Sequence, residues 1–119
     1  WGAVECNTRY LRQHRGWRGF MLDQFEGNEA IGLYQRLVLA ENINRIFAEL
    51  GVPPDLDLLS IDVDGNDFWL WHALSDRYRP RVVIIEYNQG FGDEDIVTRY
   101  SAEGGMGFAT GDAAHVGIL

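Results

Sequence analysis

Two short apolar runs that end abruptly in acidic residues do most to constrain the fold of this chain. The first covers residues 58–61 and ends at Asp62, and the second covers residues 82–85 and ends at Glu86. Runs of this length are typical of strands that are buried on both faces of a parallel sheet. Because ligands of open α/β sheets bind just outside the carboxyl ends of the strands, we expect the chemistry of this chain at these two strand ends.

The rest of the sequence alternates between strand and helix patterns, which predicts an α/β fold with right-handed crossovers. The clearest helix is expected at 41–50, where Ile43, Ile46, Phe47 and Leu50 recur at helical spacing. We expect one mostly parallel sheet, with Asp23, Asp62 and Glu86 opening on the same edge. The expected strands are 20–23, 37–40, 57–62 and 81–87, and the other expected helices are 8–14, 27–36 and 66–78.

Composition narrows the choice of partners and compartment. The chain has 119 residues and a net charge of −8, and all its basic residues are arginine. An acidic chain is a poor nucleic-acid binder, and no apolar run approaches the roughly 20 residues of a membrane span. The single cysteine, Cys6, fits a reducing compartment. We therefore expect a cytoplasmic protein that binds neither nucleic acid nor a membrane.

Both ends of the sequence suggest a fragment. Trp1 has no strand or helix pattern before it, and the glycine-rich stretch from Gly104 onward has no clear periodicity. We expect residues 1–119 to form a single, partial domain whose first strand is missing, with a tail at 101–119 to which the sequence assigns no role. A chain truncated in this way is expected to be inactive or weakly active.

The acids at the strand ends are the candidate functional residues. Asp62 follows the first apolar run directly, whereas Asp64 or Asn66 also fits a helix cap, and Asp67 fits the first turn of that helix, where a carboxylate is favourable to the helix dipole. If the two strands are neighbours, Asp62 and Glu86 lie ~5 Å apart, and such a pair could share a proton, grip a cation or hold an amine. Asp23, at the end of an earlier strand, fits either a ribose-binding acid or a turn aspartate.

Several protein classes carry an Asp-x-Asp-Gly pattern like the one at residues 62–65. An EF-hand loop needs glycine at its sixth position, and Gly65 is at the fourth. Phosphatases of the haloacid-dehalogenase type carry threonine where this chain has Asn66, and they use a lysine that this chain lacks. A metal-binding Asp-x-Asp of a nucleotide-sugar glycosyltransferase stays open.

A longer series of blocks resembles one family. Residues 6–11, 16–23, 41–44, 57–67 and 80–88 occur in an order and spacing similar to the FkbM-like family of S-adenosylmethionine-dependent methyltransferases. The resemblance covers residues 1 to about 92 and implies a Rossmann-like methyltransferase sheet. The cofactor residues that it implies are Gly2 and Asn7 at the glycine-rich loop, Asp23 at the ribose, Glu41 and Asn42 near the adenine, and Asp62 near the transferred methyl.

The function that follows from this resemblance is methyl transfer from S-adenosylmethionine to a hydroxyl group of a small molecule or glycan. Because the sulfonium methyl is already activated, catalysis needs positioning of the acceptor and removal of its proton. Asp62, supported by Glu86, is the expected base, and with Asn88 these residues could instead hold a divalent ion. The alternatives are a metal-dependent phosphatase or glycosyltransferase and a non-catalytic fragment.

Overall fold

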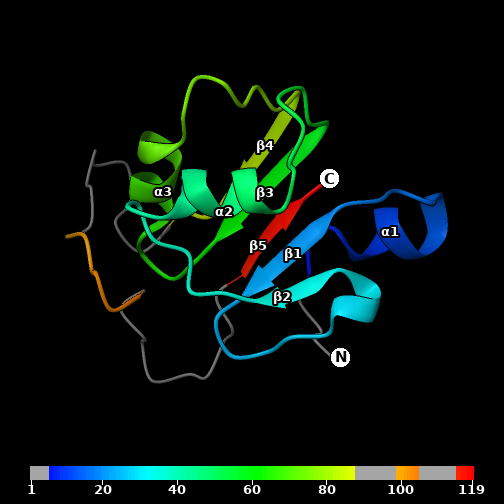
Figure 1. Cartoon of the computed structure of the whole chain (residues 1–119), viewed down its shortest axis with the longest axis horizontal. Helices are drawn as coiled ribbons and strands as arrows, with labels where there is room; N and C mark the ends of the chain where they lie inside the picture. The colour runs from blue at the N-terminus through cyan, green and yellow to red at the C-terminus, as the bar shows by residue number, and fades with distance from the viewer. Residues whose placement is uncertain (1–5, 88–98, 105–114) are drawn as a thin grey trace.

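The computed structural model describes residues 6–87, 99–104 and 115–119. Figure 1 shows an α/β arrangement in which helices flank a single sheet. The strands are β1 (Phe20–Asp23), β2 (Leu33–Gln35), β3 (Leu58–Asp62), β4 (Val82–Ile85) and β5 (His115–Ile118). The helices are α1 (Arg9–Arg15), α2 (Ile43–Glu49) and α3 (Asp67–Ala73), with one 3-10 turn, η1 (Glu29–Ile31).

The sheet is mixed, in the order β2-β1-β5-β3-β4. Strand β1 pairs in parallel with β2, and β3 pairs in parallel with β4. Strand β5 runs antiparallel to both of its neighbours, β1 and β3. The α/β class is therefore confirmed, and four of the five strands run in one direction as expected, but the central strand runs against them.

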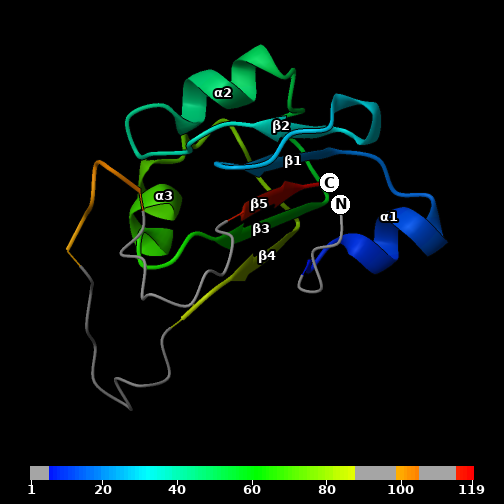
Figure 2. The ribbon, with the colours of Figure 1, turned by 90° about the horizontal axis from the view of Figure 1, so that it is seen from below.

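Strand β5 joins two parallel pairs that would otherwise be separate. In a doubly wound sheet the first strand lies between the second and the fourth, and here β5 holds that central position (Figure 2). The ladder continues past β5, because Leu58 and Leu119 exchange backbone hydrogen bonds of 2.9 and 2.8 Å. Residues 115–118 of the tail, to which the sequence assigned no role, thus supply the middle of the sheet.

Helix α2 packs its apolar side chains into the core beside the sheet. Its apolar side chains Ile43, Ile46 and Phe47 are buried and belong to the same core cluster as Leu59 and Ile61 of β3. Burial of each large apolar side chain stabilises the fold by ~1.5–3 kcal/mol. Helices α2 and α3 lie on one face of the sheet and α1 on the other (Figures 1 and 2). The helix expected at 41–50 is confirmed with slightly shorter bounds.

Two predicted elements between β1 and α2 are wrong. The expected helix at 27–36 is replaced by η1 and β2, separated by Gly32 with a φ of 73°. The expected strand at 37–40 is a loop, because the side chain of Asn42 accepts from the N–H of Leu39 (2.8 Å) and donates to the carbonyl of Leu37 (3.0 Å). These bonds use backbone groups that a strand would direct to a neighbour.

Helix α3 is shorter than the predicted helix at 66–78. The side chain of Asn44 on α2 donates to the carbonyl of Ala73 (2.8 Å) and accepts from the N–H of Ser75 (2.8 Å). These two bonds satisfy the backbone at the point where α3 ends and attach it to α2. No helix within the described ranges is long and apolar enough to cross a membrane.

Candidate functional site

The carboxyl ends of β1, β3 and β4 bring the predicted acids to one edge of the sheet. In the strand register Asp23 lies opposite His115, and His115 lies opposite Asp62. Glu86 comes beside Asp62, since its N–H donates to the carbonyl of Ile61 (3.1 Å). Because residues aligned across a sheet share a face, the side chains of the three acids lie on the face opposite α2. The predicted common edge is confirmed.

Asp62 and Glu86 interact directly. Their side chains form a hydrogen bond, as expected for two carboxyl groups about one strand spacing apart. Burial, repulsion from Asp62, Asp67 and Asp64, and the hydrogen bond to Asp62 together raise the pKa of Glu86 from 4.5 to about 7. Glu86 is the partner that holds the shared proton.

The turn between β3 and α3, residues 63–67, is held by Asp67. Its Oδ1 accepts from the N–H of Val63 (2.9 Å) and its Oδ2 accepts from the N–H of Gly65 (3.0 Å). Asp67 is buried, so its carboxylate serves the turn, in line with the structural interpretation of this residue. Asp64 has a positive φ of 52°, in a region that aspartate tolerates better than most residues.

Asp23 is engaged by the turn that follows β1. It is 2% exposed, and its Oδ1 accepts from the N–H groups of Phe25 (2.7 Å) and Glu26 (2.8 Å). This is the geometry of a turn aspartate. A ribose hydroxyl would have to reach the other oxygen, Oδ2, and the role of Asp23 in cofactor binding stays a prediction.

Asn7 lies over the sheet on the face that carries the acids. Its Nδ2 donates to the hydroxyl of Ser60 (3.1 Å), which is two positions before Asp62 on β3 and points to the same face. A Cβ at Gly117 would lie 2.7 Å from the Cγ2 of Thr8, so residues 7–8 cross β5 closely. The segment that contains Asn7 therefore approaches the acidic edge, while the predicted residue Gly2 lies outside the described residues.

Glu41 and Asn42 have different roles in the structure. Asn42 uses its side chain to hold the loop at 37–39, as described above. Glu41 is exposed and accepts a hydrogen bond from the hydroxyl of Tyr100, which in turn accepts from the N–H of Ala40 (3.2 Å). Burial and the bond to Glu41 raise the pKa of the Tyr100 hydroxyl above its usual value.

Tyr100 belongs to a segment that the sequence did not single out. Residues 99–104, which we call the strap, connect at their Ser101 to the buried Asn66 before α3 through two hydrogen bonds of 2.8 and 3.0 Å. Gly104 lies against Gln24 and Leu37. These partners are far apart in the sequence, and an isolated tyrosine in an irregular stretch gives no local signal of such contacts.

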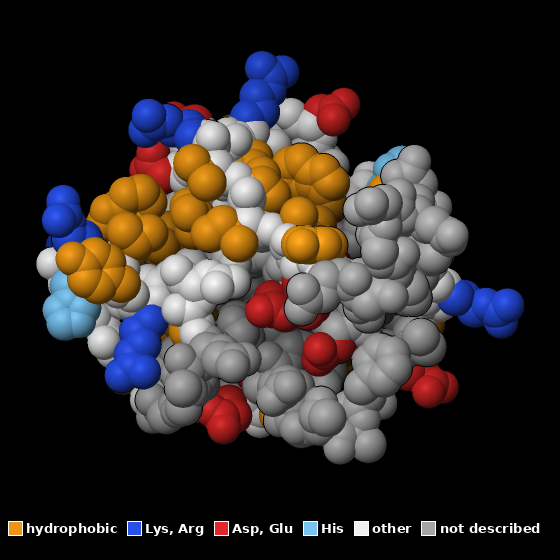
Figure 3. Space-filling model, turned by 180° about the vertical axis from the view of Figure 1, so that it is seen from behind, with side chains coloured by type: hydrophobic (Ala, Val, Ile, Leu, Met, Phe, Trp, Pro, Cys, Tyr) orange, Lys and Arg blue, Asp and Glu red, His pale blue; other side chains and the backbone are white. Residues whose placement is uncertain are grey.

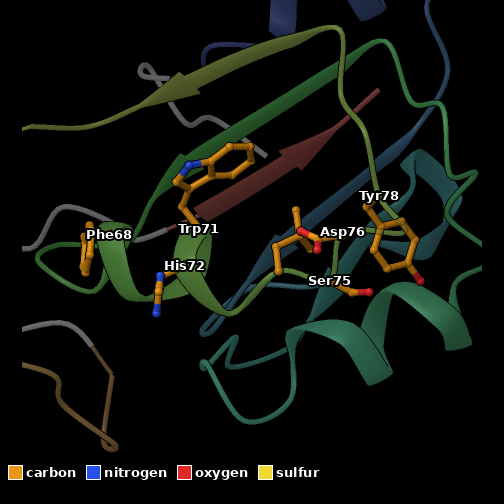
Figure 4. A pocket seen from close by; sticks show the side chains of 7 residues that line it. Phe68, Trp71, His72, Ser75, Asp76 and Tyr78 are labelled. Atoms are coloured by element: carbon orange, nitrogen blue, oxygen red, sulfur yellow. The ribbon is translucent and has the colours of Figure 1, made fainter.

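A groove of about 390 Å³ runs along α3 (Figure 4). Phe68 and His72 lie side by side on this helix, with ring centroids 5.6 Å apart and planes within 7° of parallel. Trp71 points to another side of the helix. The groove is open to solvent and contains aromatic surface and a few polar groups. It is lined by Phe68, Trp71, His72, Leu74, Ser75, Asp76 and Tyr78.

The face of the sheet opposite α2 combines apolar and acidic surface. Figure 3 shows a band of hydrophobic side chains on this face with acidic side chains below it. Strand β4 contributes to the exposed apolar surface with Val82 at 51% and Ile84 at 38% exposure. The acids therefore lie beside an apolar wall, which strengthens electrostatic interactions at this edge.

Within the described ranges, no group of three or more histidine, cysteine, aspartate or glutamate side chains is arranged to hold a metal ion. Asn88, which was considered as a further ligand, lies outside these ranges. Comparisons with protein-family models, with curated proteins and with solved structures found no match to this chain.

Proposed function

We propose that this chain carries the site of an S-adenosylmethionine-dependent methyl transfer to a hydroxyl acceptor. The observation that supports this most is the hydrogen-bonded pair of Asp62 and Glu86 at the carboxyl edge, with the pKa of Glu86 near 7. A general base works best when its pKa lies close to the operating pH. The choice of S-adenosylmethionine as the cofactor comes from the sequence blocks at this edge, because they resemble those of FkbM-like methyltransferases.

The residues at this edge fit the cofactor in part. Asp62 offers negative charge, which suits a sulfonium cation, and the exposed Glu41 offers a carboxylate to a ribose hydroxyl. Asn7 would help to close the site from the side of α1. Asp23 fits less well, because one oxygen is used by the turn. When bound, S-adenosylmethionine supplies a methyl group that is already activated for transfer.

The proposed chemistry uses the acid pair as a proton acceptor. Glu86, once ionised, takes the proton of the acceptor hydroxyl while the methyl passes from sulfur to that oxygen, which leaves S-adenosylhomocysteine. Asp62 lies beside Glu86 and repels its negative charge, so Glu86 is a stronger base than an ordinary glutamate. The acid pair would therefore hold the acceptor hydroxyl close to the methyl group and remove its proton.

The groove along α3 is the proposed place for the acceptor. Phe68, the first residue of its lining, follows Asp67 of the turn between β3 and α3, and the acid pair lies on the other face of the sheet, so the acceptor would have to reach round the end of β3. The aromatic rings of the groove would pack against the carbon skeleton of a small molecule or glycan, while His72, Ser75 and Asp76 offer hydrogen bonds to hydroxyl groups.

Direct binding and product formation test this proposal. Titration calorimetry with S-adenosylmethionine should show weak binding by this chain and tighter binding by a longer chain that includes the expected first strand and glycine-rich loop. The longer chain, incubated with a panel of hydroxylated small molecules and glycans, should release S-adenosylhomocysteine. Absence of cofactor binding by both chains would overturn the proposal. Phosphate release that Asp62→Asn abolishes, or binding of a nucleotide sugar with manganese, would instead favour a phosphatase or a glycosyltransferase.

A further inference from the structure

The strap crosses the same edge at which the cofactor is proposed to bind. Tyr100 contacts the loop before α2 through Glu41 and Ala40, and Ser101 contacts Asn66 before α3. These two anchor points belong to loops that follow different strands. A ligand that lies along this edge and reaches Glu41 must therefore meet Tyr100.

The bonding of the Tyr100 hydroxyl resembles that of a ribose hydroxyl. It donates to the carboxylate of Glu41 and accepts from the N–H of Ala40. An alcohol group of a ribose has the same capacity, one donor and two acceptor lone pairs. Glu41 is exposed, and its carboxylate is the part of the proposed cofactor site best suited to accept from a nucleoside.

We propose that Tyr100 occupies the nucleoside-binding groups of the site and competes with the cofactor for Glu41 and the Ala40 amide. This inference rests on the proposed function, since it assumes that a nucleoside cofactor binds at this edge. Under this proposal the contact of Tyr100 is autoinhibitory. When the cofactor binds, a ribose hydroxyl replaces the tyrosine hydroxyl on the carboxylate of Glu41 and the amide of Ala40.

The displacement of Tyr100 is local, because the strap has a separate attachment. The two bonds between Asn66 and Ser101 do not involve Glu41 or Ala40, and they hold the strap while the tyrosine side chain moves. The ring of Tyr100 packs edge-on against Trp69, with centroids 6.1 Å apart. Removal of the hydroxyl alone therefore ends the competition and keeps the ring contact.

The test compares Tyr100→Phe with the wild type and with Tyr10→Phe, a control in which an exposed tyrosine on α1 loses its hydroxyl. Titration calorimetry with S-adenosylmethionine should show roughly three- to tenfold tighter binding for Tyr100→Phe, the range expected when one competing hydrogen bond is removed. Tyr10→Phe should bind like the wild type. Glu41→Gln should bind more weakly, because it loses the charged acceptor.

Amide exchange without ligand tests the contact itself. The N–H of Ala40 should exchange faster in Tyr100→Phe than in the wild type, because its acceptor is gone, while the melting temperature shows that the fold is kept. Unchanged exchange at Ala40, or equal or weaker cofactor binding by Tyr100→Phe, would overturn the competition but leave the proposed function in place. If no variant and no wild-type chain binds S-adenosylmethionine, the proposed function itself falls, and this inference falls with it.

Discussion

The side chains of Asp62 and Glu86 form a hydrogen bond between two neighbouring parallel strands. Asp62 ends the buried strand β3 and Glu86 follows the mostly exposed edge strand β4, and the pairing of the two strands fixes the backbone on both sides of the pair. Two carboxyl groups held this close cannot both ionise without repulsion, and one of them keeps its proton toward neutral pH. This relationship leads to three predictions on pH and activity, and the position of β5 leads to a fourth.

The stability of the chain should fall as the pH rises through 7. The pKa of Glu86 is raised from 4.5 to about 7 in the folded state, so the folded state binds the proton more tightly than the unfolded state. The resulting stabilisation is complete below pH 4.5 and is lost through pH 7. We expect a loss of about 1 kcal/mol, smaller than the full shift implies, because water screens the exposed Glu86.

Urea unfolding at pH 4.5 and pH 8 measures this effect. Other groups titrate in the same interval, so the quantity to compare is the difference between the wild type and Glu86→Gln. Glu49→Gln is the matched control, because Glu49 is an exposed glutamate in an ion pair with Arg45. The interpretation fails if Glu86→Gln changes with pH as much as the wild type does.

The pKa of Glu86 should depend on its neighbours in a fixed order. Asp62 exerts a larger repulsion on Glu86 than Asp64 does. Asp62→Asn should therefore lower the pKa of Glu86 more than Asp64→Asn does. An NMR titration of the Glu86 carboxyl carbon in the three chains gives these values directly, and the reverse order would contradict the geometry of the acid pair.

Loss of either carboxylate should reduce the proposed methyl transfer. Glu86→Gln removes the proton acceptor, and loss of a general base typically lowers kcat by 10²–10⁴-fold. Asp62→Asn leaves Glu86 in place but removes its neighbour's charge, so the rising limb of the pH–rate profile should move below pH 7. Glu49→Gln should change neither quantity. If the kcat of Asp62→Asn lies within about threefold of the wild-type value and its pH–rate profile is unchanged, Asp62 has only a structural role.

Glycine positions around β5 should tolerate substitution poorly. A Cβ at Gly19 would lie 1.9 Å from the backbone oxygen of Ile118, whereas a Cβ at Gly117 would lie 2.7 Å from the side chain of Thr8. Overpacking costs ~1–3 kcal/mol, and a clash with backbone leaves less room for adjustment. Gly19→Ala should therefore destabilise more than Gly117→Ala in urea unfolding. Equal and small effects would mean that β5 is not packed in this central position.

The sequence was informative wherever a local pattern matched a strand or helix, although the run at 82–85, expected to be buried, forms a mostly exposed edge strand. The apolar runs before Asp62 and Glu86 predicted β3 and β4, and the helical spacing from Ile43 to Phe47 predicted α2. The same pattern placed the three acids on one edge, because parallel strands align their carboxyl ends. These features depend on residues within a few positions of one another, and their periodicity is visible without any partner.

The sequence was misleading where a side chain or a distant strand overrides the local pattern. The apolar stretch at 37–40 looks like a strand, but Asn42 binds the backbone of this stretch and makes it a loop. Likewise, nothing local indicates that residues 115–118 form the central strand, since four residues that include a glycine carry little periodicity. Their neighbours β1 and β3 determine this placement by pairing on both sides.

The sequence by itself thus determined the α/β class, the main strands with their terminal acids, and the packed face of α2. Only the tertiary structure decided that the tail fills the centre of the sheet, that Asp23 and Asp67 support turns, and that Tyr100 lies on Glu41. The physical reason is the separation along the chain. The bonds from Tyr100 to Glu41 and Ala40 span 59 and 60 residues, and those from Asn66 to Ser101 span 35. Such contacts depend on how the elements pack together and leave no trace in local periodicity.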